Sequence, residues 1–309
     1  MVAACSSNKP ATGEPGGAAV TVKHKFGQTT VASPPRRVVS AGFTEQDDLL
    51  ALGIVPVAVT NWWGDEPFGV WPWAQPKLGS AQPAVLSLAD GLQFDQITAL
   101  KPDLIVATNA GVDQDSYNRL SGIAPTIPQA GDDPFFEPWK LQADTIGLAV
   151  FQADQMKSLV AAVDNRFADV AKTNQQFKGK KVLLLQGAFY QDNAVATLSG
   201  WRTDFLTEMG LVVPDNVTQF AVDDHRAFIP RDQVPNVLNS ADVLIWTTES
   251  DADQAALVND PTIKQLDATA QNRNVFTGKD LSGAIAFSSP LSLPVVADQL
   301  PPMLSKVLA

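Results

Sequence analysis

Two kinds of side chain in predicted loops could bind a ligand: large aromatic rings and a few cations. Residues 61–76 contain four of the protein's seven tryptophans among several glycines and prolines, a composition typical of a loop. Because loops usually lie on the surface, Trp62, Trp63 and Trp71 are candidates for a binding wall. The candidates in loops of the second half of the chain are Tyr190, Trp201, Arg202, His225 and Arg226.

Rings and cations together suit a broad organic anion. The rings supply apolar contact area, and the planar fork of an arginine donates two parallel hydrogen bonds to acidic oxygens. Each group also has a structural alternative. The tryptophans could instead cap a hydrophobic core, and Arg226 could instead offset the adjacent Asp223 and Asp224.

The sequence lacks the side chains and motifs of common catalytic and metal sites. His24 and His225 are its only histidines and Cys5 is its only cysteine, so a histidine-rich transition-metal site is not expected. No nucleophile elbow, phosphate-binding loop or dinucleotide-binding glycine motif occurs. These features favour binding over catalysis, with no resident cofactor or metal.

Charge and hydropathy exclude two further classes. The formal net charge of −11 opposes binding to nucleic acid, and no basic run provides a local exception. No stretch approaches the roughly 18 consecutive apolar residues that a transmembrane helix needs. Apolar residues make up 45% of the chain and charged residues 18%, which is typical of a globular protein with a sizeable core.

Residues 1–19 predict a flexible tether, because they are rich in Gly, Pro, Ser, Ala and Thr. Cys5 follows small residues and precedes this polar segment, which resembles the lipid-attachment box of bacterial lipoproteins. Only Met1 stands where the apolar segment of a signal peptide would be expected to precede the box. The alternative is a stray surface cysteine in a disordered tail.

Residues 152–177 predict one long helix. Met156, Val163, Phe167 and other apolar residues recur at helical spacing on one stripe, with no internal Pro or Gly. Alternating strand and helix patterns flank it on both sides, at residues 20–150 and 178–309. The chain therefore predicts two α/β lobes joined by this helix at 151–177, although an ordinary surface helix is the alternative.

The flanking patterns predict most of the individual elements. In the first lobe we expect a hairpin at 20–31, then strands and helices in a βαβ rhythm, with Thr44 capping a helix at 45–52. In the second lobe, the expected elements are strands at 181–186, 242–247 and 274–277, helices at 203–209 and 232–238, and a closing helix at 290–308 kinked or divided by its prolines.

Several segments in the expected order resemble one known family, the periplasmic iron-siderophore-binding proteins. They are 35–40 (PRRVVS), 48–59 (DLLALGIVPVAV), 94–106 (FDQITALKPDLIV), 123–126 (IAPT), 240–246 (SADVLIW) and 289–294 (SPLSLP). The resemblance runs from about Val20 to the end of the chain. Together with the tether and the composition, it suggests an actinobacterial lipoprotein of the iron(III)-dicitrate-binding type.

The resemblance implies a substrate-binding protein of an ABC importer, a monomer held at the outer face of the cell membrane by a lipid. It implies that a ligand cleft lies between the lobes and that an intact ferric siderophore is delivered from it to a permease. The permease-docking glutamates of the family correspond here to Asp95 and Asp232, whose alternative role is helix capping. The iron would stay with its chelator, with no protein ligand.

Other ligands and functions remain open. Haem or cobalamin would be ligands of the same fold, and haem would need an axial donor such as Tyr190 or His225. Haem-binding relatives often place a tyrosine, and hydroxamate-binding relatives an arginine, near the position of Ser80. A chelate-modifying enzyme and an envelope interaction protein are alternatives from other classes.

Overall fold

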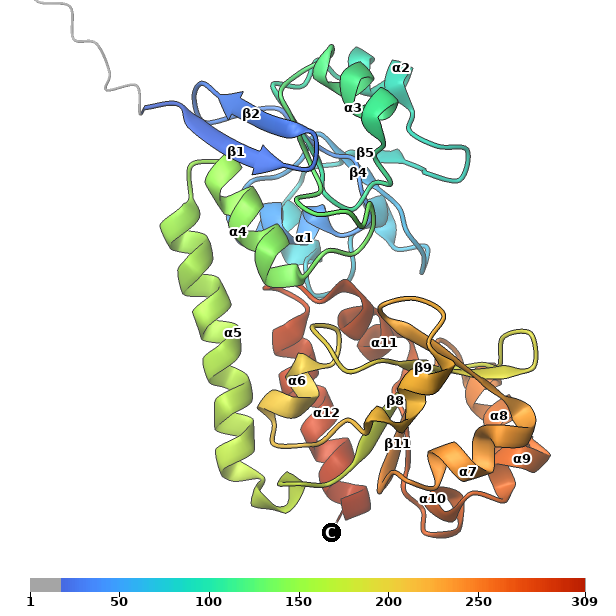
Figure 1. The fold of residues 1–309 in the computed structure, drawn as a ribbon. Helices are drawn as coiled ribbons and strands as arrows, with labels where there is room; N and C mark the ends of the chain where they lie inside the picture. Colours follow the sequence, from blue (N-terminus) through green and yellow to red (C-terminus); the bar gives the residue numbers. More distant parts are fainter. Residues whose placement is uncertain (1–17, 309) are drawn as a thin grey trace, which may run out of the picture.

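The computed structural model describes residues 18–308, which form two α/β lobes connected by a long helix (Figure 1). A two-stranded antiparallel hairpin opens the first lobe, with β1 at Val20–His24 and β2 at Gly27–Val31. This hairpin confirms the prediction for residues 20–31.

The first lobe contains a five-stranded sheet in which all neighbouring strands are parallel. Its strand order is β5-β4-β3-β6-β7, so consecutive strands are joined by crossovers. The elements in chain order are β3 (Val38–Ser40), α1 (Glu45–Ala51), β4 (Ala58–Thr60), β5 (Ala84–Leu86), α2 (Phe94–Ala99), β6 (Leu104–Ala107), α3 (Gln114–Ser121), β7 (Thr126–Pro128) and α4 (Trp139–Ala149). The sequence pattern did not predict β5, whose three residues are too few to show alternation.

The predicted linking helix is α5, which runs from Ala153 to Thr173 and is followed by a 3-10 turn at Gln175–Phe177. Its buried residues are Met156, Val163 and Phe167, as expected from the apolar stripe. In Figure 1 this helix runs along one side of the molecule, from the end of α4 in the first lobe to β8 in the second. The fold of two α/β lobes joined by one long helix is therefore confirmed.

The second lobe contains a mixed sheet in the order β10-β9-β8-β11-β12. Parallel pairing joins β8, β11 and β12, whereas β9 and β10 pair antiparallel. The strands are β8 (Val182–Gln186), β9 (Asn193–Thr197), β10 (Arg226–Pro230), β11 (Val243–Thr247) and β12 (Asn274–Phe276). The helices are α6 (Asp204–Glu208), α7 (Val234–Leu238), α8 (Asp251–Asn259), α9 (Pro261–Lys264), α10 (Asp267–Ala270), α11 (Gly278–Phe287) and α12 (Leu293–Leu308). Strands β9 and β10 and helices α8 to α11 were not predicted.

Two local predictions differ from the structure. Helix α12 continues through Pro301 and Pro302, so the predicted division is wrong and the alternative of a kink stays a prediction. Thr44 precedes α1 but its side chain makes no capping hydrogen bond. Its hydroxyl instead accepts hydrogen bonds from the amides of Asn109 and Gln142, at 3.0 and 3.1 Å.

The lobes share a hydrophobic core rather than meeting only through α5. One cluster of buried residues contains Leu49 and Ile127 of the first lobe together with Val182 and Leu293 of the second. Helix α12 packs against α5 along the same side. Since breaking this cluster would expose apolar surface to water, the core resists large separation of the lobes.

Candidate functional site

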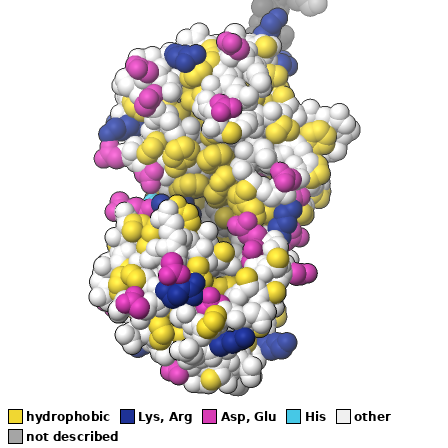
Figure 2. Space-filling model, turned by 90° about the vertical axis from the view of Figure 1, so that its right-hand side faces the viewer, with side chains coloured by type: hydrophobic (Ala, Val, Ile, Leu, Met, Phe, Trp, Pro, Cys, Tyr) yellow, Lys and Arg dark blue, Asp and Glu magenta, His cyan; other side chains and the backbone are white. Residues whose placement is uncertain are grey.

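The main cavity lies between the lobes, near the ends of strands β8, β9 and β11, and has a volume of about 780 Å³. Such a volume is within the range of about 300–1,000 Å³ that is usual for small-molecule sites. Figure 2 looks onto the hollow and shows hydrophobic side chains gathered along its edge on the first lobe. The principal lining side chains are Trp62, Trp63, Asp133, Phe135, Phe136, Gln186, Thr197, Arg202, Asp223, Asp224, His225, Arg226, Thr247, Glu249, Ser282 and Ile285.

Four aromatic rings of the first lobe form one wall of this cavity. Trp62 and Trp63 follow β4, and Phe135 and Phe136 lie in the loop before α4. Trp62 packs against Phe136 with 5.1 Å between ring centroids, and it stacks on Phe43 at 5.5 Å. Because each ring is held by others, the wall presents a fixed apolar surface to the cavity.

Trp71 does not line the cavity, although it belongs to the same predicted loop. Its side chain is only 1% exposed and stacks on Trp73 with 5.1 Å between centroids. A side chain at Gly283 of α11 would collide with the Trp71 ring, so this glycine permits the helix to approach. Trp71 thus has the core role that was the alternative for these rings, and it supports Trp63 from behind.

Arg202 is the cation with the fewest partners in the cavity. Its guanidinium lies between the rings of Phe136 and Trp201, 4.5 and 4.7 Å from their centroids. Its Nε is inaccessible to solvent and has no hydrogen-bond partner within residues 18–308. Burial lowers the pKa of Arg202 to about 10, which still leaves it charged at neutral pH. A cation held this way can donate hydrogen bonds to an anionic ligand.

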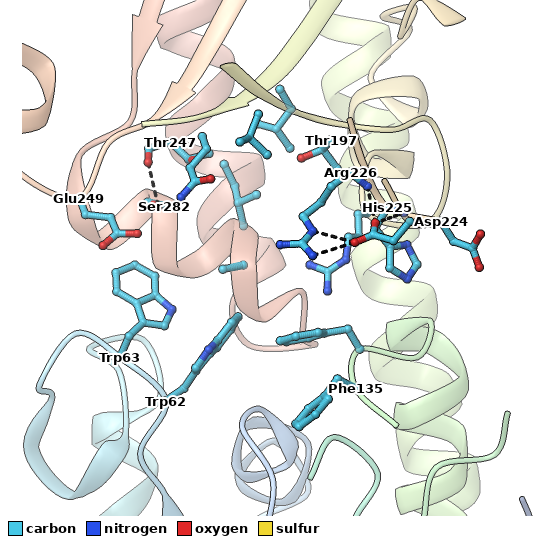
Figure 3. Close-up of a pocket in the computed structure, with 18 of the residues that line it drawn as sticks. Trp62, Trp63, Phe135, Thr197, Asp224, His225, Arg226, Thr247, Glu249 and Ser282 are labelled. Carbon is cyan, nitrogen blue, oxygen red and sulfur yellow. Dashed lines mark hydrogen bonds and ion pairs between the residues drawn. The ribbon is translucent and has the colours of Figure 1, made fainter. Parts of the chain in front are cut away.

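The other two cations have carboxylate partners. Arg226 at the start of β10 pairs with Asp223 at 2.8 Å. His225 Nε2 lies 3.3 Å from Asp133 Oδ2, a contact that joins the second lobe to the first across the cavity. Figure 3 shows His225 and Arg226 together on one side of the cavity. Arg226 thus has the charge-offsetting role that was its alternative, while also lining the cavity.

Besides Trp71, two more of the expected ring residues do not line the cavity. Trp201 packs edge-on against His225, with 5.7 Å between centroids, and so supports the cavity from behind. Tyr190 lies in the turn between β8 and β9, is 48% exposed and packs against Phe228. The expectation that Tyr190 shares one site with Trp62 and Arg202 is therefore not met. Tyr190 lies in the tight turn from β8 into the antiparallel strand β9, which the sequence did not predict, and this turn does not line the cavity.

Four carboxylates in the cavity were not expected: Asp133, Asp223, Asp224 and Glu249. Asp133 and Asp223 pair with His225 and Arg226, and Figure 3 shows Asp224 pointing away from the other lining side chains. In an acidic chain, no local signal distinguishes these four residues from surface aspartates and glutamates. By contrast, Phe135 and Phe136 could have been predicted as cavity residues, because they are large rings in a predicted loop with Gly131 and Pro138.

Beneath the site, the first turn of α1 contains three buried acids. Glu45, Asp47 and Asp48 are at most 1% exposed, and Glu137 lies beside them at 5%. Burial raises the pKa of Glu45 and of Glu137 to about 7 and that of Asp47 to about 6, and it raises the pKa of Asp48 well above its ordinary value. The acidic first turn of this helix is therefore an internal feature rather than a surface one.

Asp95 and Asp232 are both exposed and lie on different lobes. Asp95 is in the first turn of α2, and Asp232 is in the 3-10 turn before α7. Neither side chain accepts a capping hydrogen bond. The cap role that was their alternative is thus absent. Cys5 and the tether at residues 1–19 lie largely outside the described residues, which begin at 18.

Within the described residues, no group of three or more His, Cys, Asp or Glu side chains is arranged to hold a metal ion. No helix in that part of the chain combines the length and apolarity required to span a bilayer. Neither observation adds a site beyond the cavity between the lobes.

Comparison with known proteins places the chain in a family. Residues 38–281 match the model of the family described as "Periplasmic binding protein". A periplasmic solute binding protein from Mycobacterium smegmatis, known from its crystal structure, has 60% sequence identity to this chain. The two structures match with a TM-score of 0.90, over 94% of this chain and 99% of that one. PiaA of Streptococcus pneumoniae, whose crystal structure is a complex with ferrichrome, has 25% sequence identity to this chain. The TM-score is 0.76, over 94% of this chain and 98% of PiaA.

Curated relatives match over a shorter length. The petrobactin-binding protein YclQ of Bacillus subtilis is 30% identical over 169 residues, which are 54% of this chain and 51% of the relative. The chain spans about half the length of the curated relatives it matches. The family match covers most of the described residues and includes both lobes and α5. This chain belongs to the periplasmic binding protein family, a family of binding proteins rather than of enzymes.

Proposed function

We propose that this protein captures an intact ferric siderophore in the cavity between its lobes and delivers it to an ABC import permease. The observation that carries the proposal is the pairing of an aromatic wall on the first lobe with the partnerless cation Arg202 on the second. A ferric siderophore has a broad organic surface and acidic oxygens around the metal. Rings fit the surface, and a buried guanidinium fits the oxygens.

Relatives support the choice of ligand class. PiaA was crystallised with ferrichrome, and YclQ is named for petrobactin, so proteins similar to this chain bind different iron chelates. In our proposal the chelator retains all the iron ligands and the protein contacts only the organic shell. The lack of a metal-binding group of side chains among the described residues is compatible with that mode.

The test is a titration of the purified protein with a panel of ferric chelates, read by tryptophan emission and by native mass spectrometry. We expect a one-to-one complex and quenching, because Trp62 and Trp63 line the cavity. The Trp62→Leu variant should show a smaller absolute loss of emission on ligand binding, whereas Trp246→Phe, at a core position, should leave that absolute loss unchanged. Absence of binding to every chelate in the panel would contradict the proposal.

Haem is a weaker candidate for this geometry. Tyr190 lies away from the cavity, and Nε2 of His225 is already engaged by Asp133. An axial iron ligand would therefore require the His225–Asp133 contact to break. A Soret band that shifts on His225→Ala would identify haem ligation and would overturn the chelate proposal.

We further propose attachment and docking sites outside the cavity. Cys5 would carry the lipid that holds the protein at the outer face of the membrane. The name of one relative, a probable siderophore-binding lipoprotein of Bacillus subtilis, supports this proposal. Asp95 and Asp232, one exposed on each lobe, would pair with basic side chains of the permease. Their side chains are one methylene shorter than the glutamates of the family, so the docking distance would be shorter.

A further inference from the structure

Three charged side chains of the cavity lining have no ion pair within residues 18–308: Arg202, Asp224 and Glu249. Figure 3 shows Asp224 pointing away from the other lining side chains. Asp223 pairs with Arg226, and Asp133 contacts His225, which is an ion pair only when the imidazole is protonated. Arg202 is the cavity arginine with no ion pair within residues 18–308. Glu249 is its counterpart of opposite sign. It lines the cavity, and its carboxylate has no ion pair or hydrogen bond within the same residues.

The two charges lie at different sides of the cavity. Figure 3 shows Glu249 above Trp63 on one side, and Arg226 with His225 on the other. Arg202 belongs to the second group, since it is close enough to Asp133, Asp223 and Arg226 for their charges to affect its pKa. The unpaired carboxylate of Glu249 and the unpaired guanidinium of Arg202 thus lie on different sides of the cavity, which is also lined by the aromatic wall.

The backbone that carries Glu249 is firmly held. Ser250 caps α8 by accepting a hydrogen bond from the Asp253 amide, while the Glu249 amide donates to the Asp253 carboxylate, both at 3.1 Å. This arrangement resembles a capping box, except that the Asp253 carboxylate accepts from the amide of the residue before the cap. The preceding residue, Thr248, accepts a hydrogen bond from the Gly278 amide at 3.1 Å. The backbone position of Glu249 is thus set before any ligand arrives.

A carboxylate beside an indole is a chemical match for a cationic nitrogen. The carboxylate accepts hydrogen bonds from an ammonium group, and the face of the indole attracts the same charge. Figure 3 shows the Glu249 carboxylate pointing toward the Trp63 ring, and Trp63 is held from behind by Trp71 at 4.7 Å between centroids. Partial burial and the nearby Asp253 raise the pKa of Glu249, which is the behaviour of a carboxylate without a compensating cation.

We propose that Glu249 and Trp63 form a subsite for a protonated amine on the bound chelate. Resting on the proposed function, this inference narrows the substrate class to ferric siderophores that carry an ammonium arm in addition to their acidic iron-binding oxygens. Arg202 receives the oxygens, and the Glu249–Trp63 subsite receives the arm. Selectivity among iron chelates then depends on the arm as well as on the metal centre.

The test compares two trihydroxamate chelates that differ at one nitrogen. Ferrioxamine B ends in a primary ammonium group, and N-acetylferrioxamine B has a neutral amide at the same place. We expect the wild-type protein to bind ferrioxamine B about three- to tenfold more tightly, the size of one charge–carboxylate and cation–π contact at a partly exposed site. Glu249→Gln should bind both chelates equally, with the affinity of the wild type for the acetylated one.

The matched control is Asp251→Asn, which removes the same charge two residues away at an exposed position in the first turn of α8 that does not line the cavity. The preference should persist in this variant. Equal affinity of the wild type for both chelates, or a preference that survives Glu249→Gln, would overturn the subsite. Binding of an anionic chelate without any binding of ferrioxamine B would also overturn it while leaving the proposed function intact. Failure to bind any chelate would remove both.

Discussion

The carboxylate of Asp47 in the first lobe accepts a hydrogen bond from the hydroxyl of Ser289 in the second lobe, with 2.6 Å between Oδ2 and Oγ. The same oxygen accepts a second hydrogen bond from Trp73 Nε1 at 2.8 Å. Asp47 is fully buried, and its other oxygen has no partner within the described residues. The lobes are therefore joined at the base of the cavity by a buried acid that has no cation beside it.

This contact predicts that stability depends on pH. Burial raises the pKa of Asp47 from 3.8 to about 6, so the folded state holds the proton more tightly than the unfolded chain does. Proton binding to Asp47 therefore adds to the free energy of unfolding. This contribution is fully present below the unfolded pKa of 3.8, and it is lost as the pH rises through the folded pKa of about 6. A shift of this size corresponds to roughly 3 kcal/mol of unfolding free energy.

The Asp47→Asn variant should lack this contribution, because its amide oxygen can accept both hydrogen bonds and cannot ionise. Denaturant unfolding at pH 5 and pH 8 should show a larger gain over the wild type at pH 8 than at pH 5. Asp154→Asn, at an exposed position in α5, should follow the wild type at both values. An identical pH dependence of the wild type and Asp47→Asn would show that the buried acid does not titrate in this range.

The two arginines of the cavity should differ in importance. Arg202→Ala should weaken an anionic tris-catecholate chelate of iron by roughly tenfold to a hundredfold, because hydrogen bonds to charged groups contribute about 1.5–3 kcal/mol each. The double variant Arg226→Ala with Asp223→Asn removes an ion pair without changing net charge, and should weaken binding much less. Calorimetry measures both.

Neutral ferrichrome is the comparison ligand for the arginine variants. Arg202→Ala combined with Arg226→Ala should reduce affinity for the anionic chelate far more than for ferrichrome. Normal binding of every chelate by the Arg202→Ala, Arg226→Ala variant would exclude a role for these two arginines in recognition.

Charge reversal at the proposed docking residues should separate binding from transport. Asp95→Lys combined with Asp232→Lys should abolish chelate uptake by cells, because like charges would then face the basic side chains of the permease. Ligand affinity of the purified variant should be unchanged, since neither residue lines the cavity. Asp115→Lys combined with Asp251→Lys is the matched control, and uptake at the wild-type rate by the docking variant would refute the assignment.

Membrane attachment should depend on Cys5. The Cys5→Ala variant of the native precursor should be released from membranes, because a multiply acylated cysteine supplies the two lipid signals that stable anchoring requires. Cell fractionation with an antibody to the second lobe measures this. Ser6→Ala provides a control next to the cysteine, and equal membrane retention of all three forms would exclude the lipid anchor.

Local pattern was sufficient for the architecture. The apolar stripe of α5, with Met156, Val163 and Phe167 on its buried face, is a property of residues close together in the chain, and it predicted the connection between the lobes. Strands such as β8 and β11 are short apolar runs that can only be buried. Composition bore on the type of site, since two histidines and one cysteine make a histidine-rich transition-metal site unexpected.

The tertiary structure decided which side chains of a loop reach the cavity. Trp63 and Trp71 belong to one predicted loop, yet Trp63 lines the cavity and Trp71 is buried under α11. Tyr190 and Arg202 both follow β8, but strand β9 lies between them, with Tyr190 before its start and Arg202 after its end. Glu249 became a candidate only because Trp63, from the other lobe, lies beside it. Loop side chains are oriented by packing against residues distant in sequence, and local periodicity contains no information about those contacts.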